Sequence, residues 1–134
     1  MIKKVPFSNL HLSIREIWEW FEFSQKASDE YKLKIRELLL SASAVPIEFH
    51  GMSLSEVNEL FDRHRKESEN ILCLNLLVSV EAVLRIEYLQ RVYKKNKDPL
   101  SRSFRDLYRE KENRVRLDED ILRLWKHHHP ELKG

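Results

Sequence analysis

Residues 71–93, ILCLNLLVSVEAVLRIEYLQRVY, decide the fold that we expect for this chain. The stretch is apolar on nearly every side of a helix, whereas a helix at a protein surface shows a single apolar stripe. It is about as long as a membrane span, but Glu81, Arg85 and Glu87 would each cost roughly 2.5–3.5 kcal/mol near a bilayer centre. We therefore expect no membrane contact and a central helix that neighbouring helices cover.

The composition favours helices in the rest of the chain as well. Gly51 and Gly134 are the only glycines among 134 residues, and sheets depend on turns that use glycine. Cys73 is the single cysteine, which excludes an internal disulfide and a paired-cysteine zinc site and favours a reducing, cytoplasmic compartment. We predict one all-α domain over residues 1–134, a bundle of five or six helices around the long central helix.

Apolar spacing and capping signals place the helices before the central one. The spacing predicts a helix from Ser8 or Asn9 into the mid-twenties and another from Asp29 to Ala42, capped by Ser28 or Asp29. Residues 53–56, SLSE, form a capping box. No proline or glycine follows until Pro99, so this segment is either one long helix or two helices broken in the polar run 62–70.

Similar signals place the last two helices. Asp98 and Pro99 are typical of an N-cap followed by the first helical residue, and Asp118 is expected to cap the last helix, whose Leu124 and Trp125 face inward. That helix should end in His127–His129, because Pro130 cannot continue a helix interior. Neighbouring helical residues point about 100° apart, so we expect no metal site and no cofactor there, but an exposed, frayed helix end.

Basic residues gather in the second half of the chain. From Arg91 to Arg116 there are 10 Lys or Arg residues against 4 Asp or Glu, a balance that attracts phosphate. A solvated helical surface with many ion pairs is the alternative explanation. The candidate nucleic-acid-binding residues are Arg91, Lys94, Lys95, Arg102, Arg105 and Arg109.

Three further residues have the chemistry of a metal-free ribonuclease site. Glu81 lies in the apolar run and needs a cationic partner, either Arg85 four residues later on the same helix or an arginine from another helix. Arg123 could stabilise a phosphate, and a histidine of the same helix could accept the proton of a 2′-hydroxyl. His127 lies four residues after Arg123 on the same face. His128 lies about 140° from Arg123 on a regular helix, so that pair would converge only at an unwound helix end or across a dimer.

Residues 53–134 resemble the HEPN superfamily (higher eukaryote and prokaryote nucleotide-binding), and most of all its bacterial toxin and defence ribonucleases. The resemblance lies in NILCLNLLVSVEAVLRIEYLQRVYKK followed by DPLSRSFRDLYREKENRVRLDEDILRLWKHHHPELKG. It implies a helical bundle that dimerises and cleaves RNA without metal through an Arg-x4–6-His motif. It also implies that Glu81 stands where a carboxylate supports the motif arginine.

The chain departs from this family pattern at the motif itself. Arg123 and His128 match Arg-x4-His formally, but they end a helix, and in the relatives the motif helix would follow residue 134. We therefore expect a HEPN-like module that is inactive or weakly active and lacks a C-terminal helix. Two alternatives are open, a helical interaction subunit (antitoxin-like or scaffold) that uses aromatic residues 17–23, and a nonspecific nucleic-acid binder that uses residues 91–116. A homodimer through helical faces is expected, with RNA or a protein as further partner.

Overall fold

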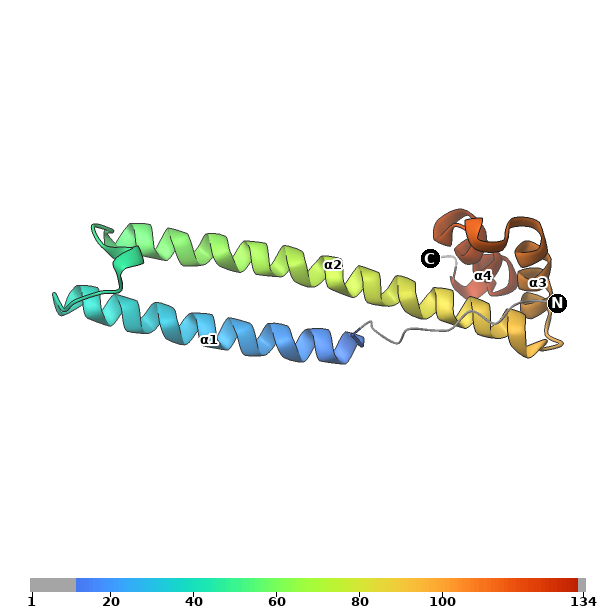
Figure 1. The fold of residues 1–134 in the computed structure, drawn as a ribbon, viewed down its shortest axis with the longest axis horizontal. Helices are drawn as coiled ribbons and strands as arrows, with labels where there is room; N and C mark the ends of the chain where they lie inside the picture. The colour runs from blue at the N-terminus through green and yellow to red at the C-terminus, as the bar shows by residue number, and fades with distance from the viewer. Residues whose placement is uncertain (1–11, 133–134) are drawn as a thin grey trace. The chain divides into compact units, whose positions relative to one another are not determined.

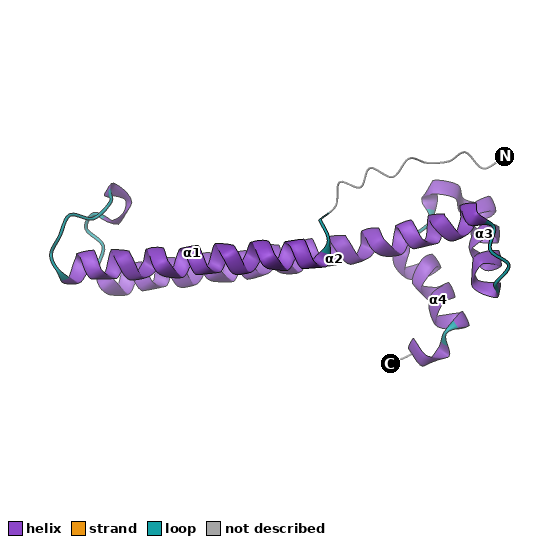
Figure 2. Cartoon of the chain, turned by 90° about the horizontal axis from the view of Figure 1, so that it is seen from below, coloured by secondary structure: helices purple, strands orange, loops and turns teal. Residues whose placement is uncertain are grey.

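A computed structural model describes residues 12–132, and every regular element in that range is helical (Figures 1 and 2). The α-helices are α1 (Ile14–Leu40), α2 (Leu54–Lys94), α3 (Pro99–Lys111) and α4 (Arg123–His128). The predicted all-α class is therefore confirmed. The bundle of five or six helices around a central helix is not confirmed, because the described residues contain four α-helices and several short turns.

The chain divides into two compact units. Among the described residues, the hairpin unit consists of residues 12–77 and the C-terminal unit of residues 78–132. The boundary falls within α2, which contributes its first part to the hairpin unit and its last part to the C-terminal unit. The prediction of a single domain over residues 1–134 stays a prediction.

The prediction of two helices before residue 43 is wrong, because α1 is one continuous helix. Ser13 caps it, because the Glu16 N–H donates to the Ser13 hydroxyl while the Glu16 carboxylate accepts from the Ser13 N–H. Ser28 and Asp29 lie inside this helix and do not begin another. Ile17 and Ile35 are both buried and lie about five turns apart on the same face. The same face of α1 is therefore buried near both of its ends. The predicted start at residues 8–9 lies outside the described residues.

Aromatic side chains close the hairpin unit at its turn. The 3₁₀ turn Ile47–Phe49 brings Phe49 against Phe61 of α2, with stacked rings 6.1 Å apart. Tyr31 of α1 meets both rings edge-on at 5.9 Å, and Ile35 and Val57 complete the buried cluster.

The predicted capping box at the start of α2 is confirmed. The Glu56 N–H donates to the Ser53 hydroxyl at 3.2 Å, and the Ser53 N–H donates to the Glu56 carboxylate at 2.7 Å. Hydrogen bonds from the Ser53 N–H and side chain to the carboxylate lower the pKa of Glu56. The helix then continues for 41 residues without a break in the polar run 62–70.

The C-terminal unit folds α3 and α4 onto the last part of α2. The Ser101 N–H donates to the Asp98 carboxylate at 2.9 Å, which confirms Asp98 as the cap of α3. Leu124 and Trp125 pack against the core, as predicted. The core residues are Tyr88, Val92, Leu100, Phe104, Leu107, Val115 and Ile121.

Asp120, and not the predicted Asp118, holds the turn before α4. Asp118 is exposed, and the chain enters a π-helical turn, Leu117–Leu122, that has no side-chain cap. Asp120 is 2% exposed. It accepts the Arg116 N–H at 2.8 Å and pairs with Lys111 Nζ at 2.6 Å. The buried carboxylate thus ties the turn to the end of α3.

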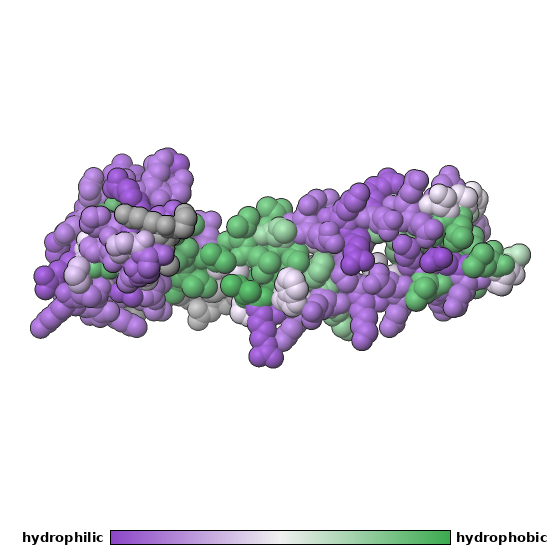
Figure 3. Space-filling model, turned by 180° about the vertical axis from the view of Figure 1, so that it is seen from behind, coloured by the Kyte–Doolittle hydropathy of each residue, from purple (hydrophilic) through white to green (hydrophobic). Residues whose placement is uncertain are grey.

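The apolar middle of α2 is not covered on every side. In the hairpin unit, Ile71, Leu74 and Leu77 are exposed, and Figure 3 shows hydrophobic side chains gathered at the surface. In the C-terminal unit, Val78 and Val83 are also exposed. Within residues 12–132, no helix is both long enough and apolar enough to cross a membrane.

Candidate functional site

Glu81 pairs with the nearer of its two expected partners. Arg85 Nε donates to Glu81 Oε1 at 2.8 Å, and both side chains are about half exposed. Arg85 Nη1 also donates to the backbone carbonyl of Val115 at 3.1 Å. The pair therefore fastens the segment after α3 to α2, and among the described residues no arginine of another helix contacts Glu81.

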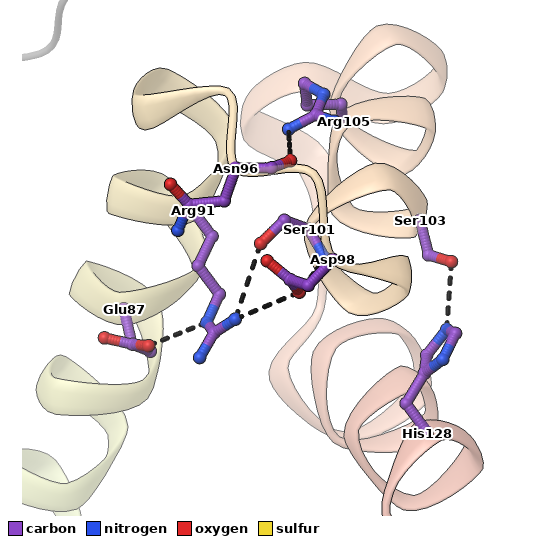
Figure 4. A network of polar contacts seen from close by, with 8 residues as sticks. All are labelled: Glu87, Arg91, Asn96, Asp98, Ser101, Ser103, Arg105 and His128. Carbon is purple, nitrogen blue, oxygen red and sulfur yellow. Dashed lines mark hydrogen bonds and ion pairs between the residues drawn. The ribbon is translucent and has the colours of Figure 1, made fainter.

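His128 is held by α3 rather than by Arg123. Its Nε2 lies 3.0 Å from the Ser103 hydroxyl (Figure 4). Arg123 is exposed, and its charge helps to lower the pKa of Asp120, after the hydrogen bonds from Lys111 and the Arg116 N–H. No hydrogen bond or ion pair between residues 12 and 132 joins Glu81, Arg123 and His128. The three predicted catalytic residues are thus not brought together.

The Ser103–His128 pair has the spacing of a nucleophile and its base, but within residues 12–132 no hydrogen bond adds a further catalytic group to it. Activation of a serine needs a third group that orients the histidine and donors that stabilise an oxyanion. In the described part of the chain, no carboxylate bonds to His128. The hydrogen bond therefore serves to dock α4 on α3.

The end of α4 is more ordered than the sequence predicts. The His129 N–H closes the helix on the Trp125 carbonyl at 2.9 Å. The His129 ring stacks on Trp125 with centroids 5.2 Å apart, and its Nδ1 contacts Glu131 at 3.0 Å. Of the three histidines, His127 is exposed, whereas His128 and His129 are half-buried. No group of three or more possible metal ligands occurs within residues 12–132.

Arg91 joins three helices and is not free to bind a ligand (Figure 4). Its guanidinium donates to Glu87 at 2.7 Å and to Asp98 at 3.2 Å. It also lies over the Trp125 ring, 5.2 Å from the centroid. Its side chain is only 24% exposed. Two carboxylates thus neutralise a residue that the sequence placed among the phosphate binders.

Asp98 supports this network from the N-terminus of α3. Hydrogen bonds from the Ser101 hydroxyl and N–H, together with the charge of Arg91, hold the pKa of Asp98 below its usual value. The carboxylate therefore stays ionised at neutral pH and serves as both a helix cap and an ion-pair partner.

Within residues 12–132, five cations near this network in the sequence make no ion pair with a carboxylate. The ion pairs of the C-terminal unit involve other residues. Arg105 Nη1 donates to the Asn96 carbonyl at 2.8 Å, which holds an arginine of α3 against the α2–α3 loop (Figure 4). We call this group the basic corner, and its members are Lys94, Lys95, Lys97, Arg102 and Arg105.

The basic corner differs from the predicted set by three residues. Arg91 is neutralised, and Arg109 pairs with Asp106 at 3.2 Å in an exposed contact, which is a weak interaction in water. Lys97 is exposed in the loop and was missed, although it belongs to the same basic run. The corner therefore consists of side chains that can turn toward a polyanion without breaking an ion pair.

Comparison of the chain with protein-family models, with curated proteins and with solved structures finds no match.

Proposed function

We propose that the C-terminal unit binds the phosphate backbone of a nucleic acid through the basic corner. The observation that carries this proposal is that, within residues 12–132, five neighbouring cations make no ion pair with a carboxylate, while Arg91 beside them is paired with Glu87 and Asp98. Uncompensated Lys and Arg side chains raise the local positive potential and attract phosphates. Phosphate contacts release counterions, so the binding should weaken steeply with salt.

The binding we propose is independent of base sequence. Sequence-specific RNA recognition uses exposed aromatic side chains on which unpaired bases stack. In this unit the aromatic rings pack against one another, as Tyr88 does on Phe104 and Tyr93 on Tyr108. Affinity should therefore come from charge, with dissociation constants on the order of 10⁻⁴ to 10⁻⁶ M at physiological salt.

Membership of the HEPN superfamily, the bundle of five or six helices and RNA cleavage stay predictions. Arg123 is exposed and His128 bonds to Ser103, and no hydrogen bond or ion pair among the described residues joins the two. We therefore propose binding without cleavage. This agrees with the expectation of an inactive or weakly active member of a ribonuclease family.

The test replaces three exposed members of the basic corner by neutral residues of similar length. The triple variant Lys94→Gln, Lys95→Gln and Arg102→Gln keeps the Arg91 network and the Arg105 hydrogen bond. Binding of a fluorescein-labelled single-stranded RNA is measured by anisotropy over a range of salt concentrations. We expect affinity to fall by about tenfold or more at low salt, and the slope of log K against log salt to shrink by about 0.7 for each lost contact.

A matched control removes the same charge from the other unit. Lys26, Lys34 and Lys66 are exposed and outside the ion pairs of the described residues, so their replacement by Gln changes the net charge equally. We expect the control to bind RNA nearly as tightly as the natural chain. Equal losses in both triple variants would show a general charge effect and would sink the proposal, as would the absence of binding by the natural chain at low salt.

A further inference from the structure

The hairpin unit contains a cleft beside its turn. The cleft has a volume of about 790 Å³ and lies between α1, the 3₁₀ turn Ile47–Phe49 and α2. Every residue that lines it belongs to the hairpin unit. Ligand pockets commonly measure about 300–1,000 Å³ and combine an apolar lining with a few polar groups. The cleft is therefore large enough for a small organic molecule.

Aromatic and aliphatic side chains make up the apolar part of the lining. Phe49 and Phe61 are buried, whereas Tyr31 of α1 is 41% exposed and Leu60 of α2 is 39% exposed. The Tyr31 ring lies 5.9 Å from each phenylalanine ring. The face of an aromatic ring carries partial negative charge and attracts cations. Within residues 12–132, no lysine or arginine lies over these rings, so they are open to a cation from outside the chain.

The charged groups of the cleft are two glutamates and one arginine. Glu48 lies in the turn and accepts a hydrogen bond from the Tyr31 hydroxyl at 3.1 Å. Arg63 and Glu67 both lie on α2. All three charged side chains are exposed, and none of them makes an ion pair in the described part of the chain. With His64 counted as neutral, two carboxylates against one guanidinium give the lining a net charge of −1.

This arrangement favours a positive ligand over a negative one. The Glu48 carboxylate lies at the hydroxyl end of the Tyr31 ring, so a cation over this ring also lies close to the carboxylate. An anion would have Arg63 as its partner, but Glu67 follows Arg63 by one turn of α2 and would repel the anion. The aromatic rings would also repel it, because a negative charge is disfavoured at a ring face.

We propose that the cleft binds a hydrophobic organic ammonium ion. The apolar body of the ligand packs against Leu60 and the phenylalanine rings, and its cationic nitrogen lies over Tyr31 beside Glu48. Aromatic side chains recognise quaternary ammonium groups by the same attraction. The proposal does not rest on nucleic-acid binding, because the basic corner belongs to the C-terminal unit and the cleft to the hairpin unit.

The test uses benzyltrimethylammonium, which joins an aromatic body to a fixed positive charge. Binding to the full chain is measured by titration in nitrogen–proton correlation NMR spectra. Benzyl alcohol and phenylacetate serve as neutral and anionic ligands with the same ring. We expect saturable binding of the cation with a dissociation constant of about 1 mM or lower, and shifts that are largest at residues of the cleft. The other two ligands should bind at least about tenfold more weakly.

Substitutions of the charged residues should change the affinity in opposite directions. Glu48→Gln removes the charge beside Tyr31 but keeps an oxygen that accepts the hydroxyl hydrogen bond, and should raise the dissociation constant for the cation about tenfold. Glu67→Gln should raise it about threefold. Arg63→Gln removes the repelling cation and should lower it about two- to threefold.

Glu59→Gln is the matched control. Glu59 is an exposed residue of α2 that does not line the cleft, so its replacement should leave the dissociation constant unchanged. The same spectra report whether each variant keeps its fold, and the comparison of the three ligands on the natural chain needs no variant. The proposal is overturned if the cation does not bind saturably or if phenylacetate binds as tightly. It is also overturned if Arg63→Gln weakens binding, or if Glu59→Gln acts like Glu48→Gln.

Discussion

The two units contain similar residues but enclose their cores to different degrees. In the C-terminal unit, α3, the π turn and α4 surround the last part of α2 and bury a core centred on Phe104. In the hairpin unit, two helices and a short turn bury a smaller cluster around Phe61. Apolar residues on both sides of the unit boundary, Leu74 and Leu77 in the hairpin unit and Val78 and Val83 in the C-terminal unit, are exposed where such neighbours are missing. The number of neighbouring elements determines how much apolar surface is covered, because a helix can shield only the face that it touches.

Polar contacts also join more of the separate elements in the C-terminal unit than in the hairpin unit. The C-terminal unit ties separate elements together through Arg91, the Lys111–Asp120 pair and the Ser103–His128 hydrogen bond. In the hairpin unit, Lys32–Asp62 is the ion pair that joins α1 to α2 among the described residues, and other pairs such as Arg15–Glu19 lie within one helix. The C-terminal unit should therefore be the more sensitive to single substitutions.

The largest expected effect compares a core phenylalanine from each unit. Phe104 is 0% exposed and Phe61 is 9% exposed. We expect Phe104→Ala to lower the free energy of unfolding by about 3–5 kcal/mol, and Phe61→Ala to lower it less, because the open hairpin can relax around the missing ring. Urea unfolding followed by circular dichroism measures both. A greater loss of unfolding free energy in Phe61→Ala than in Phe104→Ala would contradict this expectation.

The second effect is the acid sensitivity of the C-terminal unit. Hydrogen bonds from Lys111 and the Arg116 N–H lower the pKa of Asp120 in the folded chain. A lowered pKa stabilises the fold above the unfolded value of about 3.9, and this contribution is lost as the pH falls through the lower folded value. At pH 7, Asp120→Asn should cost about 1.5–3 kcal/mol, and the variant should lose less stability than the natural chain on going to acid.

Asp118→Asn is the control for this pH effect. Asp118 is exposed and makes only a long contact of 3.7 Å with Arg116. Its replacement should leave both the stability at pH 7 and the response to acid nearly unchanged. If the two variants respond to pH alike, the buried position of Asp120 is not the source of the effect.

The smallest expected effect concerns the candidate catalytic histidine. His128→Ala removes one hydrogen bond between α4 and α3, which should lower the free energy of unfolding by about 0.5–1.5 kcal/mol. RNA incubated without metal should be cleaved no faster by the natural chain than by this variant or by Arg123→Ala. His127→Ala serves as the control for both measurements. Metal-free cleavage that disappears in either His128→Ala or Arg123→Ala, with the fold intact, would make α4 an active site.

Features that depend on residues close together in the sequence could be predicted from the sequence alone. The Ser53 capping box and the Asp98 cap follow from residues within three positions of each other. The Glu81–Arg85 pair follows from one turn of helix. The scarcity of glycine predicted the all-α class. These features were predictable because each rests on the geometry of a single helix or its first turn.

Which of the predicted residues come together depends on how the helices pack in the tertiary structure. Arg91 is neutralised by Asp98, and His128 reaches Ser103 from 25 residues away. Asp120 rather than Asp118 carries the turn before α4, and apolar residues of α2 such as Leu74 and Leu77 are exposed although the composition of this helix predicts that neighbours cover it. The direction in which one helix packs on another sets each of these outcomes. Apolar spacing predicts which face of a helix is buried. It does not predict which side chains contact that face, or whether another helix of the same chain covers it.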